Sequence, residues 1–454
     1  MYDFGPLAAN KDPQILNYFH TTNQVSELIS NPDVNRSFIL VARPGSGKTA
    51  LVTWLVGGST SNTVIAITPD AARFLLEDDS TTTHEDQSLY ISSELYRIIF
   101  SKVIEKKETS ENLRSECKKY LESISTLLSK FFQDRVVGFN AGVFGITLAP
   151  KEKQPYLNII RKDQNMLKAK ELIKRIQDEQ KLFLVVDNPE SIVGKGLNNI
   201  TQENGIRIGS FFSSLAELKD LGVQVFVFVK EHIMQLVLNS FPDSSHFKDQ
   251  IISLEWTEEE LLALINQRVI KRIKSTWNDV FEISQVDFTK LVLPFLINGP
   301  RDLIYICNTA GKGKGKITRN DLKQGIRKLQ NDKWREISQE FNQQWPLIDQ
   351  FSRIIIDIAK REINTKQFAK EEFIEVVSHD FEKPDTPLNE LRKKKEWINS
   401  VLMDPPPFDE RMFIIGALGY IIGGEKHYPW SGQSIDKYRL AKKIFISPLL
   451  SDLL

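Results

Sequence analysis

The chain has 454 residues, which suggests about three domains. Its 59 Lys and Arg residues balance its 59 Asp and Glu residues, so the formal net charge of zero argues against a protein that coats a polyanion over its whole surface. The hydrophobic fraction of 41% predicts folded cores rather than disorder, and two distant cysteines form neither a zinc pattern nor a disulfide framework.

No membrane or export segment is expected. The first residues, MYDFGPLAANKDPQ, contain acids and a proline and lack an apolar core typical of a signal peptide. The longest apolar run, residues 412–424, is shorter than the roughly 20 residues that a spanning helix needs. The sequence therefore predicts a cytoplasmic protein, and the two cysteines fit a reducing compartment.

The first elements read as a helix, a strand, a glycine loop and a second helix. Residues 15–30 have helical spacing of apolar residues, and SFILVA at 37–42 predicts a strand. RPGSGKT follows, and an apolar helix at 50–56 ends at Gly57 and Gly58. Residues 63–68 are β-branched and predict a second strand.

The middle of the chain continues to alternate helices with strands. The charged, periodic stretch 84–133 predicts two or three helices, and the glycine-containing stretch 136–150 predicts a small hairpin. Three more helices are expected, each followed by a strand. The helices are at 160–180, 205–220 and 231–238, and the strands are at 182–187, 223–229 and 251–256. This alternation predicts a parallel sheet wrapped by helices on both sides.

The pattern becomes mostly helical after Trp256. Thr257 with Glu260 three residues later predicts a capping box at the start of a helix, and Pro300 begins another. Residues 310–321 predict a flexible basic loop.

The last hundred residues predict a winged-helix-like domain. Three helical patterns lie at about 347–362, 366–379 and 387–402, and the prolines at 405–407 interrupt the chain. Two apolar stretches, at 412–422 and 443–448, are then expected to pair as strands of a wing. The resulting organisation has three parts, which are a core at 1–256 with a helical insert at about 84–150, a helical lid at 257–340 and the winged-helix-like domain at 341–454.

The strongest motif is a phosphate-binding loop. It matches G-x-x-x-x-G-K-[ST] except that Ala42 stands at the first position. Glycines let the backbone curl so that its N–H groups face an anion, and the following helix presents its positive amino end. The expected nucleotide-binding residues are Arg43, Pro44, Gly45, Ser46, Gly47, Lys48, Thr49 and Ala50. Lys48 would meet the β- and γ-phosphates of ATP, and Thr49 would bind Mg²⁺.

An aspartate at the end of a buried strand completes the predicted site. Asp187 follows LFLVV, and a carboxylate there holds Mg²⁺ through water in P-loop proteins. Hydrolytic members usually place a glutamate next, whereas this chain has Asn188. Glu190 either reaches the site or is a surface acid, so the sequence fits ATP binding with slow hydrolysis.

Arg301 is the fourth candidate catalytic residue. The other three are Lys48, Asp187 and Glu190. Arg301 follows Gly299 and Pro300 on the first turn of a predicted helix, from which it could reach back to the γ-phosphate. The alternative is a surface arginine at a helix start.

Together these motifs resemble bacterial P-loop ATPases of the AAA+/STAND type, often encoded beside phage-defence genes. The likeness covers about residues 1–310 and is carried by NYFHTTNQVSELI, RPGSGKTAL, SLEWTEEELLALINQRV and NGPRDLI. It implies an α/β P-loop NTPase fold of the AAA+/ASCE kind, with a five-stranded core, a helical lid and nucleotide-dependent self-association. Ala42 and Asn188 depart from the pattern.

The sequence fits three functions. The first is a nucleotide-dependent switch that regulates a partner effector, for example a nuclease, in antiviral defence. The second is a DNA-binding ATPase that uses Arg392 to Lys395 on the third helix of the winged helix and the basic loop with Lys312, Lys314 and Lys316. The third is a scaffold that holds ATP without turnover.

Overall fold

The computed structural model describes most of the chain. The described residues are 1–30, 37–58, 63–67, 84–106, 109–132, 164–189, 202–241, 248–313, 315–342, 345–363, 367–400, 407–431 and 435–450. The hairpin predicted at 136–150 lies outside them.

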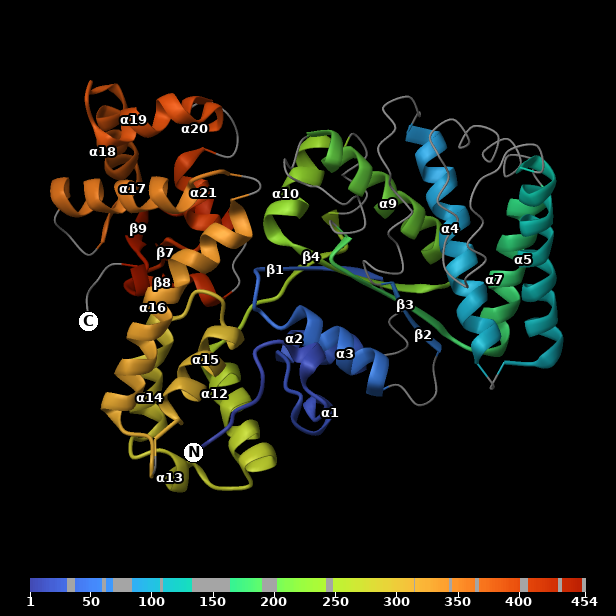
Figure 1. The fold of residues 1–454 in the computed structure, drawn as a ribbon, viewed down its shortest axis with the longest axis horizontal. Helices are drawn as coiled ribbons and strands as arrows, with labels where there is room; N and C mark the ends of the chain where they lie inside the picture. The colour runs from blue at the N-terminus through green and yellow to red at the C-terminus, as the bar shows by residue number, and fades with distance from the viewer. Residues whose placement is uncertain are drawn as a thin grey trace. The chain divides into compact units, whose positions relative to one another are not determined.

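The contacts divide the chain into two compact units (Figure 1). The first unit comprises residues 1–30, 42–54 and 253–454, and the second comprises 31–41 and 55–252. The division does not follow chain order, because the residues of the phosphate loop group with the lid and the C-terminal part.

The second unit is built on a five-stranded sheet in the order β2-β3-β4-β1-β5. The strands are β1 Phe38–Ala42, β2 Thr63–Ile67, β3 Leu182–Asp187, β4 Gln224–Lys230 and β5 Ile251–Ser253. β2, β3 and β4 pair in parallel, with Leu184 beside Ile65 and Val225. β1, β3 and β4 are almost entirely buried, which explains their unbroken apolar sequences.

Helices of this unit share one large apolar cluster with the sheet. They are α4 His84–Glu105, α5 Glu111–Phe132, α7 Gln164–Glu179, α9 Gln202–Asp220 and α10 Glu231–Ser240. In Figure 1, α4, α5 and α7 lie side by side, in agreement with the contacts between them. The expected α/β fold with a parallel sheet core is therefore confirmed.

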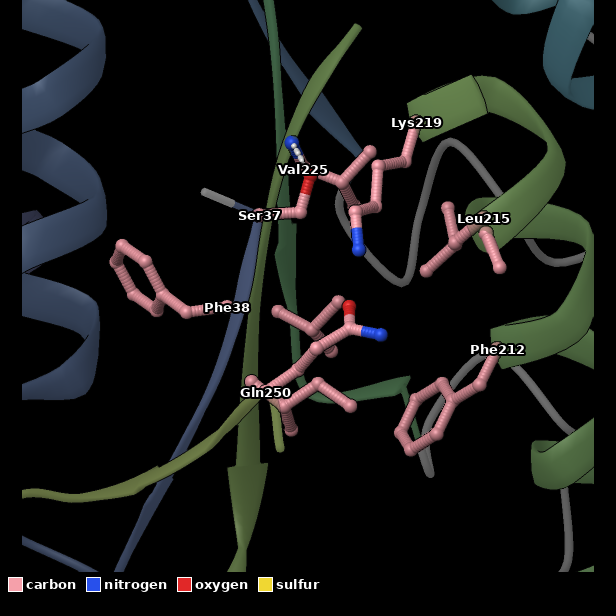
Figure 2. A pocket seen from close by; sticks show the side chains of 10 residues that line it. Ser37, Phe38, Phe212, Leu215, Lys219, Val225 and Gln250 are labelled. Carbon is pink, nitrogen blue, oxygen red and sulfur yellow. Dashed lines mark hydrogen bonds between the residues drawn. The ribbon is translucent and has the colours of Figure 1, made fainter. Parts of the chain in front are cut away.

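A small pocket lies between α9 and the amino ends of β1 and β4 (Figure 2). Phe212, Leu215 and Lys219 reach it from α9, and Ser37 accepts a hydrogen bond from the backbone N–H of Val225 at 3.0 Å. The phosphate loop follows the opposite, carboxyl end of β1, so this pocket is not the predicted nucleotide site.

The first unit holds the amino-terminal segment, the phosphate loop, the lid and the C-terminal helices. Its helices before the lid are α1 Ile15–Tyr18 and α2 Asn23–Ser30, and α3 Lys48–Gly58 begins in this unit. The segment expected as the lid, 257–340, contains α12 Glu258–Gln267, a π-helix Arg268–Ile273, α13 Trp277–Val280, α14 Gln285–Val292, α15 Pro300–Ala310 and most of α16 Arg319–Phe341.

The C-terminal part combines helices with an antiparallel sheet in the order β6-β9-β7-β8. The helices described there are α17 Ile348–Glu362, α18 Lys370–Glu382, α19 Pro387–Lys394, α20 Glu396–Ser400, α21 Phe408–Ile414 and α22 Ile435–Leu440. The strands are β6 Phe368–Ala369, β7 Leu418–Ile422, β8 Glu425–His427 and β9 Lys443–Ile446. The predicted pairing of the two apolar stretches is found between β7 and β9, and Gly423 and Gly424 form the turn of the β7–β8 hairpin with positive φ.

Three local predictions differ from the structure. The helix expected at 15–30 is two helices, because the Thr22 hydroxyl accepts the Val25 N–H and starts α2 afresh. Residues 412–414, expected as strand, end helix α21, whose first turn carries Asp409 and Glu410. The helix that directly precedes the hairpin is thus α21, which is buried throughout, and not the basic helix α19.

Candidate nucleotide-binding site

The phosphate loop has the backbone that its sequence predicts. It leaves the buried strand β1 and enters α3 at Lys48. Gly45 and Gly47 have φ of 75° and 103°, values that residues with a side chain rarely adopt. The first N–H groups of α3 lack partners within the helix, so the turn ends at an amino terminus suited to an anion.

Lys48 is held inside the loop. Its side chain is buried, and its Nζ donates to the carbonyl oxygens of Ala42 at 2.8 Å and of Arg43 at 2.7 Å. The Ser46 hydroxyl donates to the same Arg43 carbonyl at 2.7 Å. An ammonium group is therefore fixed where the loop turns into the helix, as the motif requires.

The lid packs directly against the tip of the loop. The Arg301 N–H donates to the Gly45 carbonyl at 3.2 Å, and a Cβ on Gly45 would lie 2.8 Å from the Cβ of Asn298. The indole N–H of Trp256 donates to the Ser46 carbonyl at 3.0 Å. Gly45 thus serves both the turn and the close approach of α15.

The Arg301 side chain is paired with an acid of α16. Its guanidinium lies 3.0 Å from Glu336, which also accepts from the Asn298 amide at 3.3 Å. Glu336 further lies 2.7 Å from the buried Lys333, whose ammonium is 2.7 Å from Asp302.

These charges shift each other's pKa values. Burial opposes ionisation of Glu336, but Lys333 and Arg301 outweigh it and lower the pKa of the Glu336 carboxyl. Burial also opposes the charge of Lys333, but Asp302 and Glu336 outweigh it and raise the pKa of the Lys333 ammonium. Glu336 and Lys333 therefore stay charged at neutral pH, and Arg301 would have to exchange Glu336 for a phosphate in order to act as predicted.

The remaining predicted residues of the loop differ in where they lie. Thr49 and Ala50 form the first turn of α3 and are half-buried. Pro44 lines a small cavity with Asn298 and Glu336. Arg43 turns its side chain into the C-terminal part, where its guanidinium donates to the Phe413 carbonyl at 2.8 Å.

Asp187 lies in the second unit, at the carboxyl end of β3, and is 8% exposed. The next residue, Asn188, has φ of 53° and donates its N–H to the Phe228 carbonyl at 3.1 Å, so the chain turns sharply after the aspartate. Asparagine tolerates this left-handed conformation better than most residues. Glu190 lies outside the described residues, and the predicted sharing of Mg²⁺ by Thr49 and Asp187 stays a prediction.

The chemistry of the loop suits a phosphate group. Helix N–H groups and the Lys48 ammonium are donors for phosphate oxygens. The Thr49 hydroxyl and, in the other unit, the Asp187 carboxylate are of the types that Mg²⁺ binds. Among the described residues, the nearest atom to a Cβ built on Gly47 would belong to Trp256, at 3.8 Å, so this side of the glycine is not crowded by them.

Sequence reasoning missed several residues around the loop. Trp256, Asn298 and Glu336 all contact it or its neighbour Arg301. Trp256 stands directly before the predicted capping box, and this position in the sequence could have marked it as a residue near the loop. Glu336 lies 35 residues after Arg301 in a helix with ordinary charge spacing, and no motif marks it.

Comparisons with known proteins find similarity only at the level of structure. No family model and no curated protein sequence matches the chain. The ORC2 protein of Aeropyrum pernix in its ADP form aligns with a TM-score of 0.39 and 11% identity, over 87% of this chain and 91% of that chain. Its ADPNP–ADP complexes align with a TM-score of 0.40 and 10% identity, over 94% and 95%. Drosophila ORC bound to DNA aligns with a TM-score of 0.32 and 11% identity, over 97% and 88%.

Within the described part of the chain, no helix combines the length and apolar character needed to cross a membrane.

Proposed function

We propose that this chain binds ATP with Mg²⁺ and hydrolyses it slowly, as an ATPase of the AAA+/STAND kind. The observation that carries the proposal is the loop of Gly45 to Thr49, which has left-handed glycines, a buried lysine held at the loop and a helix amino terminus behind a buried strand. The two glycines let the backbone adopt the left-handed turns that point N–H groups toward an anion, which residues with a side chain would oppose.

Each residue has a distinct role in this proposal. The loop N–H groups and Lys48 bind the phosphates, and Arg301 leaves Glu336 to contact the γ-phosphate. Thr49 and Asp187 hold Mg²⁺, which when bound neutralises charge on the phosphates. Because Asn188 stands where hydrolytic members usually place a glutamate, this position supplies no base for the attacking water, and hydrolysis is slow unless Glu190 takes that role.

The cellular role we propose is a switch in antiviral defence. ATP binding would hold the core and the lid together through Lys48 and Arg301, promote self-association and change the surface offered to an effector protein such as a nuclease. The contacts of α15 with the loop support this, because they connect the lid to the nucleotide site through Gly45 and Arg301.

The test is nucleotide binding by the full chain and by Lys48→Ala. The wild type should bind a fluorescent ATP analogue with Mg²⁺, and the variant should bind at least about tenfold more weakly, since it loses a charge-assisted contact of about 1.5–3 kcal/mol. Lys393→Ala, at an exposed pair with Glu390 on α19, is the matched control and should bind normally. Equal affinity of Lys48→Ala and wild type would refute the site assignment.

A second candidate is a DNA-binding ATPase. The observation that favours it is a basic segment, residues 312–328, which has seven Lys or Arg residues and one acid in a chain of zero net charge. Arg319 and Lys323 stand four residues apart at the start of α16, with Arg327 four further, so they share one side of the helix. The helix α19 is a weaker candidate, because Lys393 is paired with Glu390 and Arg392 with Asn399.

A further inference from the structure

The side chain of Arg43 crosses from the phosphate loop into the C-terminal part of the same unit. It is 4% exposed, although it belongs to a loop that should face a ligand. One guanidinium nitrogen donates to the Phe413 carbonyl at 2.8 Å, and the guanidinium carbon lies 4.4 Å from the centre of the Phe413 ring. A buried arginine with both a hydrogen bond and a cation–π contact to one residue is a specific attachment, because its desolvation requires such partners.

The attachment point is the end of helix α21. Gly416, with φ of 83°, donates to the Phe413 carbonyl at 2.9 Å, and Ala417 donates to the Met412 carbonyl at 2.9 Å. These two bonds form a Schellman motif, which ends the helix. The carboxyl end of a helix carries partial negative charge, so the Arg43 cation is favourably placed there.

The helix that receives Arg43 is itself firmly held. Asp409 lies 3.4 Å from Lys370 and accepts from the Tyr438 hydroxyl at 3.1 Å. Glu410 accepts two hydrogen bonds from Arg439, at 2.7 and 2.9 Å. Because α21 is anchored at its other side chains, a displacement of Arg43 acts on a rigid element rather than on a free loop.

The turn after α21 also fits the lid closely. A Cβ on Gly416 would lie 2.3 Å from a methyl group of Ile297 and 3.4 Å from the Arg43 guanidinium. The glycine is therefore required both by its backbone conformation and by this close packing.

The backbone of Arg43 contacts two side chains of the phosphate loop. Its carbonyl oxygen accepts from Lys48 Nζ and from the Ser46 hydroxyl, both at 2.7 Å. The residue that holds the end of α21 therefore also holds the ammonium group that would bind phosphate.

We propose that Arg43 is a positioning residue that couples nucleotide occupancy of the phosphate loop to the packing of the α21–β7 turn. This inference rests on the proposed nucleotide binding and adds how the site communicates with the C-terminal part. When Lys48 moves to phosphate oxygens, it leaves the Arg43 carbonyl, the loop relaxes, and the guanidinium loosens its hold on Phe413. By linkage, a partner that loosens the α21–β7 turn increases the affinity for ATP to the same degree.

Hydrogen exchange of the full chain tests this coupling. With and without saturating ATP and Mg²⁺, amide exchange is measured in the peptide that covers residues 408–422, and nucleotide binding is measured separately. In the wild type, ATP should accelerate exchange of this peptide by about fivefold or more, the lower end of typical coupling. Arg43→Met keeps an aliphatic side chain but loses the guanidinium group. In this variant, exchange should already be fast and ATP should not change it. Arg43→Lys, which keeps the charge, should restore part of the response.

Arg361→Met is the matched control. It removes an exposed arginine that is paired with Glu362 on α17, changes neither the loop nor α21, and its response to ATP should equal that of the wild type. Unchanged exchange in wild-type protein that demonstrably binds ATP would overturn the coupling and leave the proposed function standing. An equal response to ATP in Arg43→Met and the wild type would likewise overturn it, and absence of ATP binding would overturn both proposals.

Discussion

A lysine in the interior of the lid shows how single residues fix the candidate site. Lys333 and Asp302 are each 1% exposed, and their charged atoms lie 2.7 Å apart. The other Asp302 oxygen accepts the N–H groups of Ile297 and Asn298, both at 2.8 Å. One buried ion pair therefore determines the path of the chain where it meets Gly45.

Replacing Lys333 by Met should destabilise the protein by about 3–5 kcal/mol, because it leaves the Asp302 carboxylate buried with only its two N–H partners. Urea unfolding at pH 7 measures this as a lower midpoint. Lys393→Met, at an exposed pair, should change the midpoint little. A normal midpoint for Lys333→Met would show that the carboxylate does not need the lysine.

The shifted pKa values of Glu336 and Lys333 explain why the urea unfolding is measured at pH 7. Because folding lowers the pKa of Glu336, its ionised carboxylate stabilises the fold at pH values above the ordinary pKa of 4.5. This contribution is lost as the pH falls through the folded-state pKa. Because folding raises the pKa of Lys333, its ammonium group stabilises the fold at pH values below the ordinary pKa of 10.5. This contribution is lost as the pH rises through the folded-state pKa. Both contributions are present at pH 7.

At the scale of elements, helix ends were the most readable part of the sequence. The capping box predicted from Thr257 and Glu260 is present, with hydrogen bonds of 3.2 Å and 2.9 Å between their side chains and backbone N–H groups. The Glu260 carboxylate also accepts the Asn23 N–H at 2.7 Å, so the cap connects the lid to the start of α2.

Thr257→Ala should therefore lower the free energy of unfolding by about 1 kcal/mol, the usual cost of losing an N-cap. Thr257→Ser, which keeps the hydroxyl, should retain most of the stability. Both are measured by thermal unfolding followed by circular dichroism, and an equally stable alanine variant would mean that the cap does not contribute.

Strand and helix could not be distinguished where an apolar run was short. Residues 412–422 are apolar throughout, yet the first three belong to α21 and Leu418 to Ile422 to β7. The boundary is set at Gly416, whose left-handed backbone ends the helix and whose missing side chain makes room for Ile297. That neighbour comes from the lid, so local sequence could not reveal it.

At the scale of the whole molecule, the second candidate function predicts that the basic segment, residues 312–328, contacts nucleic acid. Duplex DNA should then bind with an affinity that falls steeply with salt, and the double variant Lys323→Ala with Arg327→Ala should bind more weakly. Its log–log salt slope should be smaller by about 0.9 for each phosphate group that the variant leaves without a cation. Fluorescence anisotropy at several salt concentrations measures both quantities.

Lys102→Ala, at an exposed ion pair with Glu105 on α4, serves as the control and should leave DNA binding unchanged. Absence of binding at about 50 mM salt would exclude the DNA-binding function and favour the switch.

The sequence alone determined the alternating strands and helices, the phosphate loop and the helix caps, because each depends on neighbouring residues, on local backbone conformation or on the period of apolar side chains. Only the tertiary structure decided that Arg301 is paired with Glu336 and that Arg43 points to Phe413. Those pairs join residues 35 and 370 positions apart, and which charges meet over such distances depends on how the helices pack.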